Sequence, residues 1–372
     1  MLRKFKLDSK LIKEIDFGMI VTIILITLIG VVNIYSAVGM GNAEKQFFFL
    51  IFSLVCLYFL LLIDYNILEN YVVLFYWFNM LLLVLTKFVL GSEINGATGW
   101  IKLGPLSFQP SELAKIAMIL MLAKKIQDYE GKINNLKNFV ITAMYAVIPM
   151  GLIVIQPDMG MCMVSFFIAL GIFFCVGLDG RIIVAGLFGL AVFIMTVWNS
   201  GLIKGYQKRR LISFLNPEGD PSGDGLQVTR ALIGIGSGGF FGTGVQFGAN
   251  AGKGYTDVFV PENHTDMIFS VLGEHWGTIG CIILLALYGI LLYKMIKVAK
   301  ASKDIFGSVI AVGMVSYFLF AILQHIGMNI AIMPITGITL PFMSYGGSSL
   351  LTTTLSVGLV INIGMRKKKI NF

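Results

Sequence analysis

Charged residues are scarce in this sequence of 372 residues. Only 13% of the chain is Asp, Glu, Lys or Arg, whereas 57% is hydrophobic and the mean hydropathy is +0.85. A soluble globular domain carries about 25% charged residues. The composition therefore excludes a soluble globular protein and predicts one that crosses a membrane several times, so chain length gives no estimate of a number of soluble domains.

Cysteine and histidine are also rare. The four cysteines all lie within apolar runs and lack the spacing of metal ligands. They are typical of small buried hydrophobic residues, which excludes a disulfide framework and a cysteine metal site. Two of the three histidines, His264 and His275, occur in one short segment.

Long apolar runs dominate the chain. A helix needs roughly 20 apolar residues to cross a bilayer. We expect spans at Ile15–Val38, Phe47–Ile63, Tyr71–Leu90, Ser111–Ile126, Val140–Ile155, Gly160–Val176, Ile182–Trp198, Thr265–Tyr293, Ile305–Asn329 and Ser348–Gly364. The first run is too long for the core of a signal peptide, so we interpret it as a retained helix. The predicted fold class is an all-α polytopic membrane protein, with ten transmembrane helices in a single domain over residues 1–372.

Basic residues cluster between the apolar runs, so the net charge of +8 does not indicate a nucleic acid partner. The clusters lie at the N-terminus and at residues 124–137, 294–303 and 366–369. Cytoplasmic loops of membrane proteins carry an excess of Lys and Arg. Even numbers of expected spans separate the clusters, which places all of them, both termini and a short loop at Asp64–Glu69 in the cytoplasm.

The same parity places three connections outside the cell, at Gly91–Pro110, Asn199–His264 and Met333–Gly347. The second is the longest connection, between spans seven and eight, and a loop of that length is usually functional. Its basic stretch Lys204–Arg210 opposes the usual charge bias, so either an anionic ligand or lipid headgroups favour it there. The glycine-rich run Gly234–Gly254 lacks the ending of a P-loop, which favours flexible or closely packed backbone over a phosphate cradle.

Polar residues crowd into the stretch Val258–Gly277, which leads into an apolar run. Such a cluster is costly at a membrane edge unless it is used. Asp266 fits two interpretations: a partly desolvated general base, or a cap at the start of the eighth span. Glu262 and His264 close by favour a functional site.

Other polar groups also have two interpretations. Glu112 and Lys115 share one helix face, either lining an interior cavity or forming an interfacial ion pair that orients the helix. Turn chemistry explains Asp158 as well as a function does. The segment Pro334–Ser349 is expected to be irregular backbone buried in protein or lining water. His325, inside span nine, is more typical of a buried core histidine than of a ligand.

Six segments in chain order together resemble the SEDS family of bacterial cell-wall proteins. They are FQPSELAK (108–115), QPDMG (156–160), GYQKRRLISFLNPE (205–218), GIGSGGFFG (234–242), PENHTDMIF (261–269) and PITGITLPFMSYGGSS (334–349). The resemblance covers roughly residues 95–363, and the short tails and the FVPENHTD context look most like the RodA branch, which acts in elongation.

This resemblance implies a peptidoglycan glycosyltransferase that polymerises lipid II on the outer face of the membrane, beside a class B penicillin-binding protein. The essential aspartate of the family maps onto Asp266, as general base of an inverting displacement. Lys115 and Arg210 would stabilise the leaving diphosphate, a role that a divalent cation, Mg or Mn, could share. The other substrate-binding residues expected are Glu112, Asp158, Trp100, Glu262, His264, Ser344, Gly346, Gly347 and Ser348.

The chain departs from the family pattern in several places. Gly99 stands before Trp100 where the family often has Arg, which puts a basic substrate contact in doubt unless Lys102 replaces it. His275 replaces the second Glu of a common GEELG motif, and His325 replaces an Asn. A conservative change puts Met in place of a Phe directly after the proposed base.

Two other functions stay open: a flippase or transporter for lipid II, and a non-catalytic scaffold for a penicillin-binding protein. The ionisable candidates Glu112, Lys115, Asp158, Arg210 and Asp266 all fall at the expected outer side. No ionisable chain crosses the expected midplane, which favours chemistry at one face over transport. The presence of Asp266 argues against a scaffold.

Overall fold

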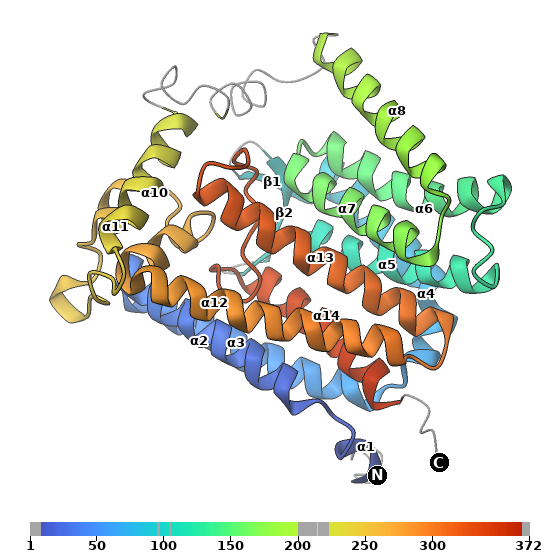
Figure 1. The fold of residues 1–372 in the computed structure, drawn as a ribbon, viewed down its shortest axis with the longest axis horizontal. Helices are drawn as coiled ribbons and strands as arrows, with labels where there is room; N and C mark the ends of the chain where they lie inside the picture. The colour runs from blue at the N-terminus through green and yellow to red at the C-terminus, as the bar shows by residue number, and fades with distance from the viewer. Residues whose placement is uncertain (1–8, 95–96, 104–105, 200–213, 215–222, 367–372) are drawn as a thin grey trace.

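Long helices lie side by side along most of the molecule in the computed structural model, which describes residues 9–94, 97–103, 106–199, 214 and 223–366 (Figure 1). Within these described residues, eight helices are long and apolar enough to cross a membrane. They are α2 (Phe17–Val38), α3 (Met40–Leu62), α4 (Tyr65–Leu85) with its π-helical continuation η2 (Thr86–Leu90), α6 (Leu136–Ile155), α7 (Met159–Val176), α12 (Ile268–Ala301), α13 (Ile305–Asn329) and α14 (Gly347–Met365). The chain is therefore a multi-pass membrane protein.

The expected count of ten spans, with its orientation, stays a prediction. The other two expected spans form α5 (Pro110–Asp128), of 19 residues, and α8 (Gly180–Asn199), of 20 residues. Charged residues at both ends of α5 lower its hydropathy, so its role as a span does not follow from composition. A short helix, α1 (Ser9–Ile12), precedes the bundle.

Aspartate residues begin four of the helices. They are Asp16 before α2, Asp64 before α4, Asp158 before α7 and Asp304 before α13, and their side chains accept from the amides of Met19, Asn66, Met161 and Gly307. Asp is a preferred N-cap because its side chain satisfies a free amide of the first turn. The expected bounds of the loop Asp64–Glu69 are wrong, since only Ile63 and the cap Asp64 separate α3 from α4, while its cytoplasmic side stays a prediction.

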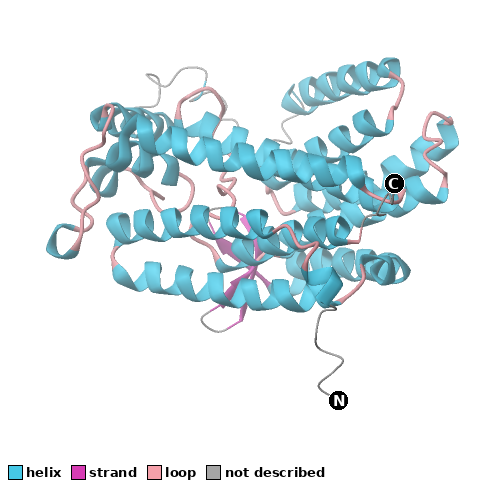
Figure 2. Cartoon of the chain, turned by 60° about the horizontal axis from the view of Figure 1, so that its bottom comes forward, coloured by secondary structure: helices cyan, strands magenta, loops and turns pink. Residues whose placement is uncertain are grey.

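A small antiparallel sheet corrects the all-α prediction (Figure 2). Strands β1 (Gly91–Ile94), β2 (Ala97–Leu103) and β3 (Leu106–Phe108) pair in the order β1-β2-β3 between η2 and α5. Ser92 pairs with Trp100, and Lys102 with Ser107. Strands β1 and β3, of four and three residues, are too short to show an alternation that predicts them from sequence.

Among the eight apolar spans of the described residues, α13 and α14 are the most buried. Of their most apolar windows, 67% and 78% are buried, against 28% for α3 and 22% for α6. Lipid tails are as apolar as these side chains, so the outer helices can leave apolar side chains on their outward faces, where lipid is expected. The segment that joins α13 to α14 is thereby held inside the bundle.

The described part of the connection before α12 packs closely. It contains α10 (Asp224–Gly238), η4 (Gly248–Asn250) and α11 (Tyr255–Phe259). A Cβ on Gly238 would collide with the Gly273 carbonyl, and one on Gly242 with the His275 carbonyl. Closely packed backbone, one of the two interpretations of the glycine-rich run, is therefore confirmed at these positions.

Ion pairs gather at one end of the bundle, where α12 ends and α2 and α4 begin. Asp16 lies 2.8 Å from Lys294, Asp64 lies 3.4 Å from Arg366, and Glu69 lies 3.7 Å from Lys124. Three of the expected cytoplasmic basic clusters thus share one end, as an even number of crossings requires.

Candidate functional site

The segment joining α13 to α14, residues 330–346, is irregular, as expected from its sequence. Its residues 338–344 are mostly buried, whereas Ile332 and Gly337 are exposed. Its carbonyl groups are bonded by side chains from the helices around it. These bonds run from His325 Nδ1 to Ile338 O (2.8 Å), Gln324 Nε2 to Pro334 O (3.0 Å), Tyr288 Oη to Pro341 O (2.6 Å) and Gln46 Nε2 to Ser344 O (3.0 Å). Such bonds allow non-helical backbone within a membrane protein. His325 is fully buried, which confirms its interpretation as a core histidine.

Asp266 lies in the turn between α11 and α12, against this segment. Its backbone carbonyl accepts from Asn329 Nδ2 at 3.1 Å. A Cβ built on Gly337 would lie 3.5 Å from Asp266 Oδ2, so the carboxylate faces the α13–α14 segment. Helix α12 begins at Ile268 with Met267 as its N-cap, which disagrees with the interpretation of Asp266 as the cap.

The residues before Asp266 are tied to the same segment. Tyr345 N donates to His264 O at 2.9 Å, and Ser344 Oγ donates to Thr265 O at 2.7 Å. Thr265 Oγ1 also donates to Glu262 Oε2 at 2.7 Å. Burial lowers the pKa of the His264 imidazole, because it disfavours the charged form, while Glu262 acts in the opposite direction.

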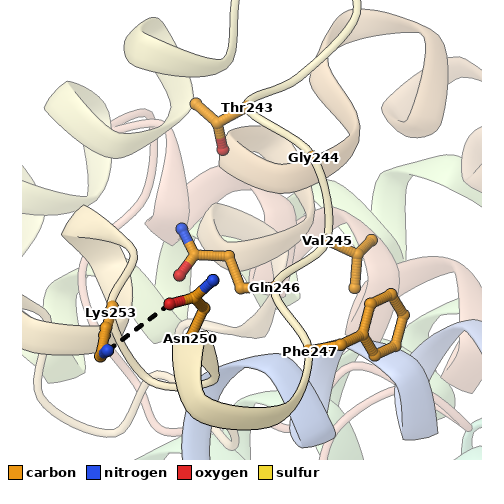
Figure 3. A pocket seen from close by; sticks show the side chains of 7 residues that line it. All are labelled: Thr243, Gly244, Val245, Gln246, Phe247, Asn250 and Lys253. Carbon is orange, nitrogen blue, oxygen red and sulfur yellow. Dashed lines mark hydrogen bonds between the residues drawn. The ribbon is translucent and has the colours of Figure 1, made fainter.

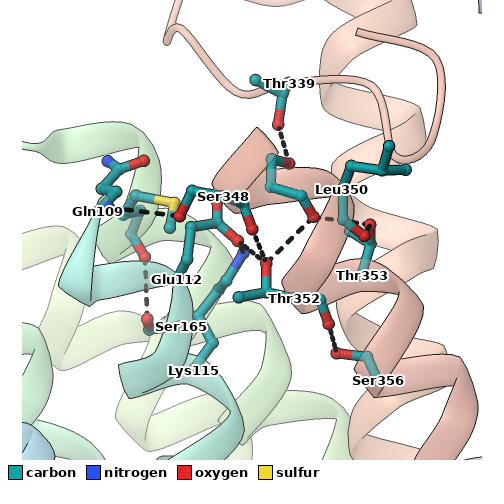
Figure 4. A network of polar contacts seen from close by, with 12 residues as sticks. Gln109, Glu112, Lys115, Ser165, Thr339, Ser348, Leu350, Thr352, Thr353 and Ser356 are labelled. Carbon is teal, nitrogen blue, oxygen red and sulfur yellow. Dashed lines mark hydrogen bonds and ion pairs between the residues drawn. The ribbon is translucent and has the colours of Figure 1, made fainter. Parts of the chain in front are cut away.

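Glu112 and Lys115 form an ion pair of 3.0 Å inside the bundle (Figure 4). The residues are only 4% and 3% exposed. Thr352 Oγ1, on α14, donates to Glu112 Oε2 at 2.8 Å, and the Lys115 ammonium lies 4.0 Å from the ring centroid of Tyr317 on α13. The interpretation as an interfacial pair is therefore wrong, since this pair joins three helices in the interior.

Gln109 connects Asp158 to the start of α14. Gln109 Nε2 donates to Asp158 Oδ2 at 3.0 Å, and Gln109 N donates to Ser348 Oγ at 3.3 Å. Burial raises the pKa of Asp158, against the opposing hydrogen bond from the α7 amide that it caps. A Cβ on Gly160 would lie 2.5 Å from Thr336 O, so the first turn of α7 touches the α13–α14 segment.

The α13–α14 segment and the first turns of α14 contact several parts of the expected site. One side of the segment meets Asp266 through Gly337, and the neighbouring Thr336 meets α7 beside Asp158. Its last residues lead into α14, where Ser348 and Thr352 contact the Gln109 and Glu112 region. A single irregular segment brings together residues that lie far apart in the sequence.

The remaining expected residues have structural surroundings of their own. Trp100 lies half-buried in β2. Gly346 N donates to Gln46 Oε1 at 3.1 Å, and Gly347 packs so closely on Phe49 that a Cβ would lie 2.7 Å from its ring. Arg210 and the rest of its basic stretch lie outside the described residues.

Sequence reasoning missed several residues that hold this site. They are Gln46, Gln109, Tyr317, Asn329 and Thr352. Tyr317, Asn329 and Thr352 are side chains with polar groups within apolar runs, which is a signal for a role in the bundle interior. The sequence does not reveal the partner of each, because those partners lie on distant helices.

A surface hollow of about 420 Å³ lies elsewhere, in the loop between α10 and α11 (Figure 3). It is lined by Thr243, Gly244, Val245, Gln246, Phe247, Asn250 and Lys253. This loop is tied to α2, since Gly252 N donates to Ser36 O at 2.6 Å. None of the expected site residues lines the hollow.

Comparisons with known proteins cover nearly the whole chain. The sequence model of the family named for FtsW, RodA and SpoVE, described as "Cell cycle protein", matches residues 16–369. The chain is 34% identical to Stage V sporulation protein E of Bacillus subtilis over 92% of this chain and 95% of that protein. It is 33% identical to peptidoglycan glycosyltransferase MrdB of Escherichia coli, over 96% and 95%.

Solved structures agree with these sequence matches. One is a chain from a study of the structural coordination of polymerization and crosslinking by a peptidoglycan synthase complex. It is 33% identical, with a TM-score of 0.81, over 94% of this chain and 97% of that one. The rod shape determining protein RodA of Thermus thermophilus is 30% identical, with a TM-score of 0.72, over 95% and 98%.

Proposed function

The chain belongs to the SEDS family of FtsW, RodA and SpoVE, and from this premise we propose that it polymerises lipid II into glycan strands on the outer face of the cell membrane. The observation that carries this proposal is the position of Asp266, whose carboxylate faces the α13–α14 segment. That segment touches the first turn of α7 beside Asp158 and leads into α14, where Thr352 bonds Glu112. Relatives named as peptidoglycan glycosyltransferases support the reaction class.

Asp266 is the general base of the proposed reaction. The 4-hydroxyl of the acceptor sugar attacks C1 of the donor, and its proton passes to the Asp266 carboxylate as the new C–O bond forms. The bond from C1 to the lipid diphosphate breaks, and the diphosphate leaves with the electron pair. Attack from the opposite face inverts the donor, so no covalent enzyme intermediate is formed.

Lys115 and Arg210 are the proposed cations for the leaving diphosphate. The Lys115 ammonium is enclosed by Glu112 and Tyr317, so a diphosphate reaches it only when this enclosure opens. Glu112, Asp158, Trp100, Glu262, His264, Ser344, Gly346, Gly347 and Ser348 are proposed to shape the substrate path. A shift of the α13–α14 segment on substrate binding would move several of these residues together.

A divalent cation, Mg or Mn, stays a proposal without a protein site assigned to it. Within the described residues, no group of three or more His, Cys, Asp or Glu side chains is placed to hold a metal ion. The steps above therefore pass through none. The proposed partner is a class B penicillin-binding protein, supported by the structural similarity to a chain of a peptidoglycan synthase complex. A role in elongation is proposed from the likeness to RodA.

Polymerisation of purified lipid II tests the proposed function. Wild-type protein with its penicillin-binding partner, itself inactivated as a crosslinker, is expected to make glycan strands, and Asp266→Asn is expected to lose at least about a hundredfold in rate. Equal rates would remove Asp266 as the base. No glycan from the wild type, together with movement of lipid II across vesicles, would favour a flippase instead.

A further inference from the structure

Glu274 lies on the second turn of α12 and is 3% exposed, yet the proposed reaction does not use it. Its carboxylate accepts three hydrogen bonds from the start of α11. Tyr255 N donates to Oε1 at 2.6 Å, while Thr256 N and Thr256 Oγ1 donate to Oε2 at 2.7 and 2.5 Å. Both oxygens are thus bonded to the first turn of a short helix, whose amides have no partner within that helix.

Asp257 and His275 strengthen the same junction. Asp257 Oδ2 accepts from Gly254 N at 3.0 Å and lies 3.4 Å from His275 Nε2, with both side chains fully buried. A Cβ on Gly254 would lie within 3.1 Å of atoms of Asp257, His275 and Glu274. The start of α11 is therefore enclosed by side chains from two consecutive residues of α12.

A short path leads from α11 to Asp266. Asn263 Nδ2 donates to Asp257 O at 3.0 Å, which folds the following turn back onto α11. Within that turn, Met267 N donates to Glu262 O at 3.0 Å, across Asp266. Helix α12 then returns to Glu274. Helix α11, the turn that contains Asp266 and the first two turns of α12 thus form a closed loop of chain, and the hydrogen bonds from α11 to Glu274 close it.

We propose that Glu274 is a positioning residue for Asp266: its bonds to α11 hold the turn in which the base points at the α13–α14 segment. This inference rests on the proposed function, because positioning has a kinetic consequence only if Asp266 acts in the reaction. A group that holds a base in place affects the rate of the chemical step more than the binding of substrate.

Glu274→Gln tests this role with little change in volume. The amide nitrogen of Gln cannot accept, so at least one of the three bonds from α11 is lost. We expect kcat for lipid II polymerisation to fall about 10- to 100-fold while KM changes by less than about twofold. The backbone amides of Tyr255 and Thr256 should exchange hydrogen faster, while amides of α13 keep their protection.

Two pairs of variants separate positioning from general damage. Glu69→Gln, at the opposite end, also replaces a carboxylate that accepts a hydrogen bond, here from Gln127 Nε2 (2.8 Å), and should leave kcat unchanged. Thr256→Val should lower kcat, whereas Thr256→Ser, which keeps the hydroxyl, should restore most of it. This ordering would not follow from a role in packing alone.

The outcomes are distinct. An active wild type with an equally active Glu274→Gln overturns the inference and leaves the proposed function intact. Loss of protection throughout the bundle, with kcat and KM both changed, reduces Glu274 to a structural residue and also overturns it. A wild type that makes no glycan overturns the proposed function, and the positioning role with it. A lower kcat with local exchange at α11 supports the inference.

Discussion

The two ends of the helix bundle use charged residues in different ways. At the end where α2 begins, most partners of the ion pairs keep access to solvent: the Lys294 and Asp16 side chains are 29% and 35% exposed, and Asp64 is 40% exposed, whereas Arg366 is 9% exposed. At the end that holds Asp266, two pairs of ionisable groups are buried, although Glu262 is exposed and Asp266 is partly exposed. Glu112 and Lys115 are 4% and 3% exposed, and the side chains of Asp257 and His275 are fully buried.

This difference has an energetic meaning. Exposed ion pairs contribute little, since water and salt screen them. A buried pair adds little net stability over an apolar replacement, but removing one partner leaves an unpaired buried charge, which is costly. The first end is therefore expected to tolerate substitution, whereas the second specifies where the site residues lie.

The largest effect on stability is expected from Lys115→Met, which leaves Glu112 buried without its cation. The free energy of unfolding should fall by about 3–5 kcal/mol. A denaturant titration of the protein in detergent measures this free energy. Glu112→Gln added to the same chain should restore much of the loss. Lys124→Met, which removes the 3.7 Å pair with Glu69, should cost less than about 1 kcal/mol. Similar losses from both lysine variants would break the comparison of the two ends.

Gly160→Ala is expected to have the next largest effect. The new methyl group would lie 2.5 Å from Thr336 O and push α7 away from the α13–α14 segment. Overpacking of this kind costs about 1–3 kcal/mol, and a thermal melt would measure the loss. Gly151→Ala is the control, because its Cβ meets nothing within 4 Å. Inside α6, that change should stabilise by about 0.5–1 kcal/mol. If both variants stabilised the protein, the contact between Gly160 and Thr336 would be loose.

Asp16→Asn should have a small effect. Asn keeps an oxygen that caps α2 but loses the charge that attracts Lys294 at 2.8 Å. We expect a loss below about 1 kcal/mol that shrinks as salt is added, because the pair is partly exposed. A loss that persists in high salt would mean that this end is less accessible to solvent than its exposed fractions indicate.

The smallest effect is a pH dependence from His264. Its pKa is lower in the folded protein than the usual value of about 6.5, so below that pH the unfolded chain binds more protons. Stability from this group is complete above about pH 6.5 and is lost as pH falls. The melting temperature of the wild type should drop more than that of His264→Gln between about pH 8 and about pH 5. Identical drops would exclude His264 as a contributor.

The site residues were predictable to different degrees. Asp266 stands out in the sequence as a carboxylate at the edge of an apolar run, and the same signal points to Glu262 nearby. The buried state of Glu112 and Lys115 was not predictable, because one helix shows only that they share a face. The hydrogen bond from Thr352 places Glu112 inside the bundle, and Thr352 lies 240 residues from Glu112 in the sequence.

By itself, the sequence determined the membrane class, most helix positions and the family. These properties depend on local composition: apolar runs of spanning length, aspartates at helix starts and a set of short motifs in order. The β-sheet and the short α3–α4 turn were not predicted from the sequence. Only the tertiary structure decided that the α13–α14 segment contacts Asp266, that α14 bonds the Glu112 pair, and that Glu274 holds α11. Those contacts link distant elements, and their energy comes from burial and hydrogen-bond geometry that no local pattern contains.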